Sequence, residues 1–234
     1  MFFPYDDINP TESTPWVTWV LIAVNVVIFF LTLDMLQLPP ERQLAALRST
    51  GALVPAEPEA RDFFISMFLH GSLSHLLGNM LFLYITGDNV EDRFGSPAYL
   101  VFYLACGVAG GLTHLFLSPA STTPTIGASG AISGVMGAYI VLFPHSEIKI
   151  FYWFYFWIGR TLISAKWWIG LWFGFQLLAG SAATAGGGGV AYGAHVGGFV
   201  AGAGIAWVAY RAGWVEAGVD YSAGRDRDDE IVYR

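Results

Sequence analysis

Long apolar runs dominate the pattern along the chain, and short groups of charged or turn-forming residues separate them. A helix needs roughly 20 apolar residues to cross a ~30 Å hydrocarbon core, and several runs meet or approach that length. The predicted spans cover residues 16–38, 75–88, 97–117, 129–143 and 166–179, with a sixth that ends near Arg211. The pattern therefore predicts an all-α membrane protein: a bundle of six transmembrane helices over residues 16–211, with tails at 1–15 and 212–234.

The connections between these runs differ in character. Residues 39–74 mix charges with apolar side chains, which indicates a partly embedded loop, and residues 118–128 hold too much Ser, Thr and Pro to be helical throughout. The aromatic run at 151–157 is too short to cross, so we expect it at the membrane interface. A glycine-rich turn at 186–189 follows the fifth span, and we expect this span and turn to form a gate.

Composition narrows the class further. Of the 234 residues, 55% are hydrophobic and 12% charged, which excludes an ordinary soluble protein. The net charge of -7 comes largely from acidic residues in the two tails, which we interpret as solvated. These acidic residues include Asp6, Asp7, Asp226, Asp228, Asp229 and Glu230. No nucleic-acid motif occurs, so the predicted partners are the lipid bilayer and other membrane proteins, with no nucleic acid.

The positions of the basic residues predict the orientation. With both termini in the cytoplasm, eight Lys or Arg residues fall on the inner side and three, Arg42, Arg48 and Arg61, on the outer side. The start of the chain has no positive region, no small-residue cleavage site and no organelle presequence. We therefore expect a multi-pass protein of a bacterial inner membrane that retains its first span.

Unusual polar residues lie near the outer ends of the second, fourth and sixth predicted spans. The second opens with His75 and Asn79, the fourth with Ser129, and the sixth carries His195. Polar groups in hydrocarbon are costly unless they face the bundle interior or water, so this clustering at one depth needs a reason. Because residues 129–143 form only roughly 22 Å of helix, Ser129 is expected several ångströms below the outer surface, in a pocket open to water.

Small residues would let the fourth and sixth helices approach closely. Positions 129, 133 and 137 are Ser, Ser and Gly at four-residue steps, and His195, Gly198 and Gly202 lie near one face of the sixth helix. Ser129 and His195 are then within reach of each other as a nucleophile and its general base. The Asn79 amide, the His75 ring and the backbone N–H of Ser129 are candidate donors for an oxyanion hole.

No carboxylate is placed to orient His195. Asp88 is the nearest acid on the second span, but it lies thirteen residues beyond His75, roughly 20 Å along a helix. The residues therefore predict a Ser-His dyad, and the group that orients the imidazole stays open.

Three motifs in this order resemble the rhomboid intramembrane serine proteases. They are His70-Gly-Ser-Leu-Ser-His75-Leu-Leu-Gly-Asn79, Gly127-Ala-Ser129-Gly130 and Ala194-His195-Val-Gly-Gly198-Phe-Val-Ala-Gly202. The resemblance implies Ser129 as nucleophile, His195 as base and His75 with Asn79 in the oxyanion hole. It also implies cleavage of transmembrane substrates at or near the membrane boundary, with neither a metal nor an organic cofactor.

The sequence departs from the family pattern at two places. Many relatives carry Trp-Arg in the first outer loop where this chain has Arg61-Asp62, and some have an aromatic residue where this chain has Ser133.

Other interpretations stay open beside the protease. Ser129 alone could be a helix cap, and His195 alone a packing residue. A non-catalytic scaffold that uses the same fold to bind transmembrane clients is the main alternative. A transporter is disfavoured, because the chain shows neither repeated halves nor an intramembrane acid for ion coupling. The substrate and the oligomeric state do not follow from the sequence.

Overall fold

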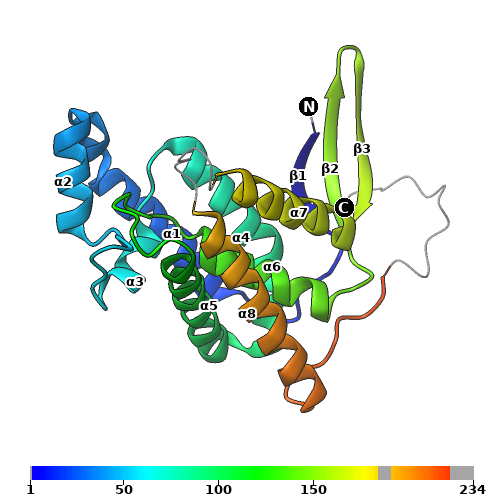
Figure 1. The fold of residues 1–234 in the computed structure, drawn as a ribbon. Coiled ribbons are helices and arrows are strands. Elements are labelled where there is room, and N and C mark those ends of the chain that lie inside the picture. The colour runs from blue at the N-terminus through cyan, green and yellow to red at the C-terminus, as the bar shows by residue number, and fades with distance from the viewer. Residues whose placement is uncertain (1, 184–190, 222–234) are drawn as a thin grey trace.

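The structure is a computed structural model that describes residues 2–183 and 191–221, and most of these residues are helical (Figure 1). The longer helices are α1 (Trp16–Leu31), α4 (Leu73–Phe94), α5 (Ser96–Leu117), α6 (Ser129–Leu142), α7 (Ala165–Ala183) and α8 (Tyr192–Arg211). Shorter helical segments are η1 (Leu33–Gln37), α2 (Pro40–Thr50), α3 (Asp62–Ile65) and η2 (Ser66–Phe68). The strands are β1 (Phe2–Asp7), β2 (Glu147–Phe154) and β3 (Trp157–Ser164).

Each of the six predicted segments is a helix, with bounds that differ at some ends. Helix α6 begins at Ser129, as predicted, whereas α1 ends at Leu31 and the chain continues as a 3-10 turn. Among the described residues, α5 is the single helix that is both long enough and apolar enough to cross a membrane, and α1 and α6 are shorter apolar helices. The connection at 39–74 holds α2, α3 and η2, so it is more regular than a loop.

Helix α4 extends beyond the predicted end at residue 88 because the charged group after it is part of the packing. The Glu91 side chain is fully buried, and its carboxylate accepts hydrogen bonds from the backbone N–H groups of Val17 (2.9 Å) and Thr18 (2.8 Å). These N–H groups belong to the first turn of α1 and have no partner within that helix. Glu91 therefore caps the N-terminus of α1, where a negative charge is favourable.

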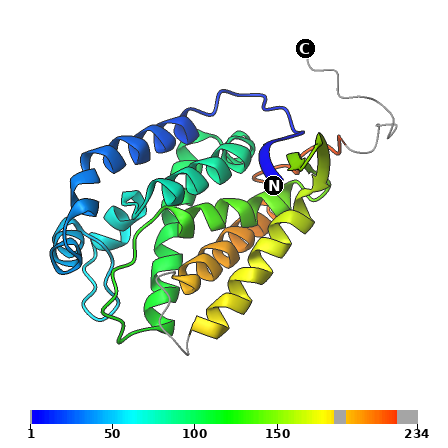
Figure 2. The ribbon, with the colours of Figure 1, turned by 90° about the horizontal axis from the view of Figure 1, so that it is seen from above.

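A three-stranded antiparallel sheet in the order β1-β2-β3 is missing from the all-α prediction. Strands β2 and β3 form a hairpin in which Glu147 pairs with Ser164 and Phe154 with Trp157. Strand β1 joins the edge of β2 from the far end of the chain. The aromatic run predicted at the interface is thus the end of a β-hairpin, which stands across the long direction of the bundle (Figures 1 and 2).

Helix α6 forms the centre of the bundle, with α8 packed closely along it (Figure 2). A Cβ atom at Gly198 would clash with the carbonyl oxygen of Gly130, and one at Gly202 would clash with that of Gly134. The predicted close approach of these two helices is confirmed, and it depends on glycines that leave room for backbone against backbone.

The N-terminal strand ends in a buried polar cluster, so the interpretation of Asp7 as a solvated acid is wrong. Asp7 is only 5% exposed, and its carboxylate accepts hydrogen bonds from Tyr139 on α6, Asn9 and Asn89 on α4. Asp6, in contrast, is partly exposed and pairs with Lys149 of β2 at 2.6 Å. Asp226, Asp228, Asp229 and Glu230, the other four of these acidic residues in the C-terminal tail, lie outside the described residues.

Burial raises the pKa of Asp7 from 3.8 to about 6, against the lowering effect of hydrogen bonds from Tyr139 and Asn9. The folded protein therefore holds a proton between pH 4 and 6 that the unfolded chain has lost. By linkage, the free energy of unfolding is highest below this window and falls by about 3 kcal/mol as the pH rises through it.

The variant Asp7→Asn should lose this pH dependence, because the amide has no charge to bury. Thermal unfolding of both proteins in detergent at pH 4.5 and 7.5 measures it. We expect the wild-type melting temperature to fall relative to that of the variant at the higher pH. Parallel behaviour of the two proteins would show that Asp7 is not the titrating group.

Candidate active site

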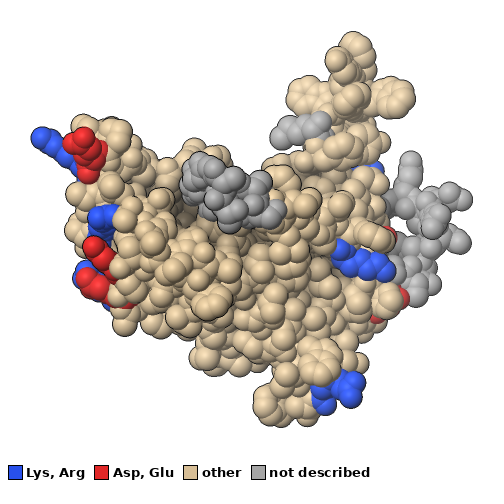
Figure 3. All heavy atoms as spheres, viewed as in Figure 1, with Lys and Arg blue, Asp and Glu red and all other residues tan. Residues whose placement is uncertain are grey.

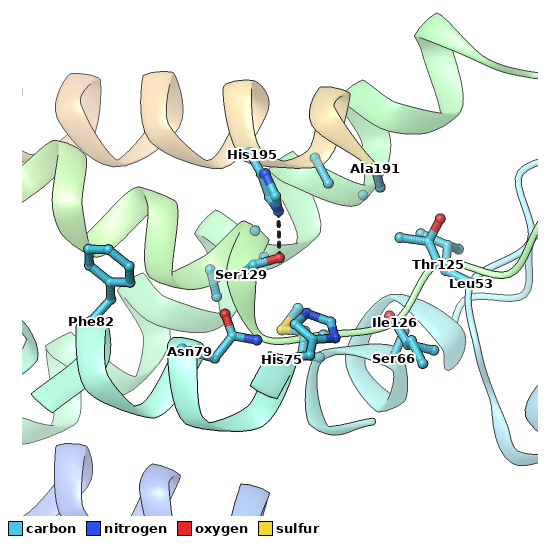
Figure 4. A pocket seen from close by; sticks show the side chains of 18 of the residues that line it. Leu53, Ser66, His75, Asn79, Phe82, Thr125, Ile126, Ser129, Ala191 and His195 are labelled. Atoms are coloured by element: carbon cyan, nitrogen blue, oxygen red, sulfur yellow. Dashed lines mark hydrogen bonds between the residues drawn. The ribbon is translucent and has the colours of Figure 1, made fainter. Parts of the chain in front are cut away.

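Ser129 and His195 meet in the interior, as the sequence predicts. The Ser129 Oγ and His195 Nε2 atoms are 2.6 Å apart, a hydrogen bond between the start of α6 and the first turn of α8 (Figure 4). The two side chains line a cavity of about 380 Å³ that His75 and Asn79 of α4 also line. All four predicted site residues thus surround one space.

Ser129 is the first residue of α6, and the loop before it, which includes residues 125–127, lines the cavity. Gly127 has φ +123°, a backbone conformation that favours glycine, and its N–H donates to the Ser66 carbonyl oxygen at 2.8 Å. Further back, Leu53 and Thr125 exchange two backbone hydrogen bonds, of 3.0 and 2.8 Å. The N–H groups of Ser129, Gly130 and Ala131 come before the first hydrogen bond of α6, from the Ile132 N–H to the Ala128 carbonyl oxygen at 3.0 Å, so they have no acceptor within the helix. N–H groups in this position can stabilise an oxyanion.

His70 is a site residue that the sequence analysis missed in this role. Its Nε2 atom lies 2.9 Å from the Nδ2 atom of Asn79, and the ring is 2% exposed. Burial, together with the neighbouring His75, lowers the pKa of His70 to about 4, so the ring is neutral and its Nε2 can accept. One N–H of the Asn79 amide is then fixed, and the other remains for a ligand in the cavity. The signal was present in the first motif, which begins at His70.

Gln176 and Trp172 of α7 surround the other side of the His195 ring. The Gln176 Oε1 atom lies 2.7 Å from His195 Nδ1, and the centroids of the Trp172 and His195 rings are 5.8 Å apart. Gln176 was missed, although it is the one polar side chain between Lys166 and Ser181 in an otherwise apolar run. A lone amide in such a helix signals an interior partner.

The structure shows what occupies the two places where the sequence departs from the family pattern. Ser133 is fully buried, and its hydroxyl donates to the Ser129 carbonyl oxygen at 2.5 Å. The aromatic contacts to His195 come from Trp172 and Tyr192. In the connection between α2 and α3, Arg61 pairs with the Glu59 carboxylate at 2.9 Å. Among residues 2–183 and 191–221, no group of three His, Cys, Asp or Glu side chains is placed to share a metal ion.

Comparison with known proteins finds matches to rhomboid proteins. A family model of the Rhomboid domain matches residues 57–212, a range that includes every site residue described above. The Rhomboid protease GluP of Bacillus subtilis is 32% identical over 129 residues, which make up 55% of this chain and 25% of that protein. The mitochondrial Rhomboid protein 1 of Saccharomyces cerevisiae is 36% identical over 90 residues, 37% of this chain and 26% of that protein.

The match to a third relative covers a larger share of that protein. Rhomboid-like protease 3 of Toxoplasma gondii is 26% identical over 133 residues, 57% of this chain and 49% of that protein. The matched parts thus span between a quarter and a half of these relatives, which come from a bacterium and from eukaryotes. Since the family model covers more than half of the chain, the protein belongs to the rhomboid family of integral membrane proteins.

Proposed function

We propose that this protein is an intramembrane serine endopeptidase that cuts transmembrane proteins at or near the membrane boundary. The observation that carries the proposal is the 2.6 Å hydrogen bond between Ser129 Oγ and His195 Nε2 inside a cavity. A serine hydroxyl becomes a useful nucleophile when an adjacent base takes its proton. Two relatives whose names include the word protease support the same class.

The chemistry follows the dyad. His195 Nε2 takes the hydroxyl proton while Ser129 Oγ attacks the peptide carbonyl carbon, and the carbonyl oxygen becomes an oxyanion. We assign the Ser129 backbone N–H, the Asn79 amide and the His75 ring as its donors. The imidazolium then gives its proton to the leaving amine, which leaves an acyl-enzyme. Water, deprotonated by His195, hydrolyses the ester and restores the hydroxyl. No cofactor takes part in these steps.

We propose that the six helices α1, α4, α5, α6, α7 and α8 cross the bilayer, with both termini in the cytoplasm. Charged side chains on the face in Figure 3 gather toward its two ends, with an uncharged band between them over the described residues. On α7, Leu171, Phe175 and Leu178 are 71%, 63% and 72% exposed, as lipid-facing residues are. A bacterial inner membrane stays a prediction, because the relatives include eukaryotic proteins.

In this orientation, the end of the β2–β3 hairpin lies at the inner membrane interface. Phe156 and Trp157 are 95% and 77% exposed there, in a run without a charged residue between Lys149 and Arg160. Aromatic rings favour the headgroup region. A Phe156→Cys variant carrying an environment-sensitive dye should show blue-shifted emission in vesicles and quenching by brominated acyl chains. The native Cys106 is buried and should not react.

A matched variant, Glu57→Cys, places the same dye on an exposed outer loop. It should show neither the blue shift nor the quenching. Equal behaviour of the two dyes would contradict the interfacial position of the hairpin.

Helix α7 is the proposed gate for substrate entry. The Phe82 ring of α4 and the Trp172 ring of α7 face each other across the cavity edge, with centroids 6.2 Å apart. A substrate helix that enters between α4 and α7 would have to part them. The glycine-rich turn at 186–189, predicted as part of the gate, lies outside the described residues.

The experiment is cleavage of a panel of single-span reporter proteins, co-reconstituted with the purified protein in vesicles. We expect at least one reporter to be cut near a membrane boundary, with the position of the cut given by mass spectrometry. Reporters that bind and co-purify but stay intact would favour the alternative, a non-catalytic rhomboid-like scaffold for transmembrane clients.

A further inference from the structure

The His195 ring has two nitrogen atoms, and the dyad uses only one of them. For Nε2 to accept the Ser129 proton, the proton of the neutral ring must sit on Nδ1. Some group has to hold that tautomer and the ring plane, because an imidazole that rotates or carries its proton on Nε2 is not a base toward Ser129. Asp88 cannot do so, because it lies near the other end of α4 from His75.

Gln176 has the position and the chemistry for this role. Its Oε1 atom, a carbonyl-type oxygen that can only accept, lies 2.7 Å from His195 Nδ1. The side chain is 7% exposed and lines the same cavity as Ser129. With Oε1 toward the ring, Nδ1–H donates and Nε2 is left as the acceptor, which is the tautomer that a general base needs.

The placement on α7 also fixes the ring from one side. Trp172 precedes Gln176 by four residues, so the two side chains lie on one face of the helix, toward His195. The next residue back, Phe175, is 63% exposed and points away from the bundle. An amide in this apolar helix is costly without a partner, and the imidazole supplies it.

We propose that Gln176 is the positioning residue of the dyad, holding the His195 ring so that Nε2 faces Ser129. This inference rests on the proposed protease function and deepens it. The Ser129–His195 pair then acts as a neutral triad in which an amide takes the place of the usual carboxylate.

The test compares three variants in vesicles with a cleaved reporter. Gln176→Met keeps the length but removes the strong acceptor, so kcat should fall about 10-fold to 100-fold while KM changes little. The rate of Ser129 labelling by a fluorophosphonate should fall by the same factor. The control Phe175→Leu changes the outward-facing neighbour and should keep wild-type values.

Gln176→Glu separates positioning from mere packing. The carboxylate still accepts from Nδ1, so kcat is retained, but it stabilises the protonated imidazole. The acid limb of the pH–rate profile should therefore move to higher pH by about one unit. This readout does not depend on whether the methionine variant folds.

The outcomes distinguish this inference from the proposed function. An inactive and unlabelled wild-type protein would overturn both. If the wild type is active, two results would overturn the role of Gln176 and leave the proposed function standing. They are full activity of Gln176→Met, or a wild-type pH profile in Gln176→Glu.

Discussion

Replacing Ser129 with alanine is expected to lower the cleavage rate by about 10⁴-fold or more, below detection in a reporter assay. The variant removes the atom that forms the acyl bond and leaves the cavity walls in place. Only one hydrogen bond, to His195, is lost from the fold, so the melting temperature should stay close to that of the wild type. Reporter cleavage in vesicles and thermal unfolding in detergent measure the two effects.

The cavity supplies a matched control. Ser74 also lines it, but its hydroxyl lies 3.1 Å from that of Ser72 and is exposed. Ser74→Ala should therefore keep most of the activity. Cleavage that survives in Ser129→Ala would refute Ser129 as the nucleophile, and an equal loss in Ser74→Ala would show that this loss is not specific to Ser129.

Replacing Gly198 with alanine is expected to damage both stability and activity. The added methyl group would overlap the carbonyl oxygen of Gly130, one residue after the nucleophile, so α6 and α8 must move apart. Overpacking of this kind costs about 3 kcal/mol. A shift of about 1 Å between Ser129 and His195 would lower the cleavage rate about 100-fold. Thermal unfolding and reporter cleavage give the two values.

Gly204 is the matched control on the same helix. A Cβ atom there would meet no atom within 4 Å. Gly204→Ala should therefore leave both measurements near the wild-type values. Equal losses in the two variants would indicate that α8 tolerates no added volume anywhere, rather than that Gly198 sets the contact with α6.

The sequence predicts the part of this structure that apolar length and small-residue spacing determine. The six helical segments follow from hydrophobic runs, and the start of α6 at Ser129 follows from the irregular stretch before it. Gly198 and Gly202 predict the α6–α8 contact because glycines one turn apart in an apolar helix are typical of close backbone packing.

The parts that escaped prediction depend on partners far away in the chain. Strand β1 pairs with β2, which lies far away in the sequence, and nothing in the N-terminal residues indicates this pairing. From the sequence, Asp7 looks like a solvated carboxylate of the tail. Only the fold shows that Tyr139 and Asn89 donate hydrogen bonds to it. Gln176 stands out as a polar residue in an apolar helix, but only the fold shows that it meets His195.

The reactivity of Ser129 toward a fluorophosphonate is the clearest measure of whether His195 activates this serine. A fluorophosphonate added to the folded protein in vesicles, followed by peptide mass spectrometry, identifies any serine that has been phosphonylated. We expect an adduct on Ser129 in the wild-type protein and its loss in a folded His195→Ala variant. An unlabelled Ser129 in the wild type, or equal labelling without His195, would contradict an activated Ser-His pair.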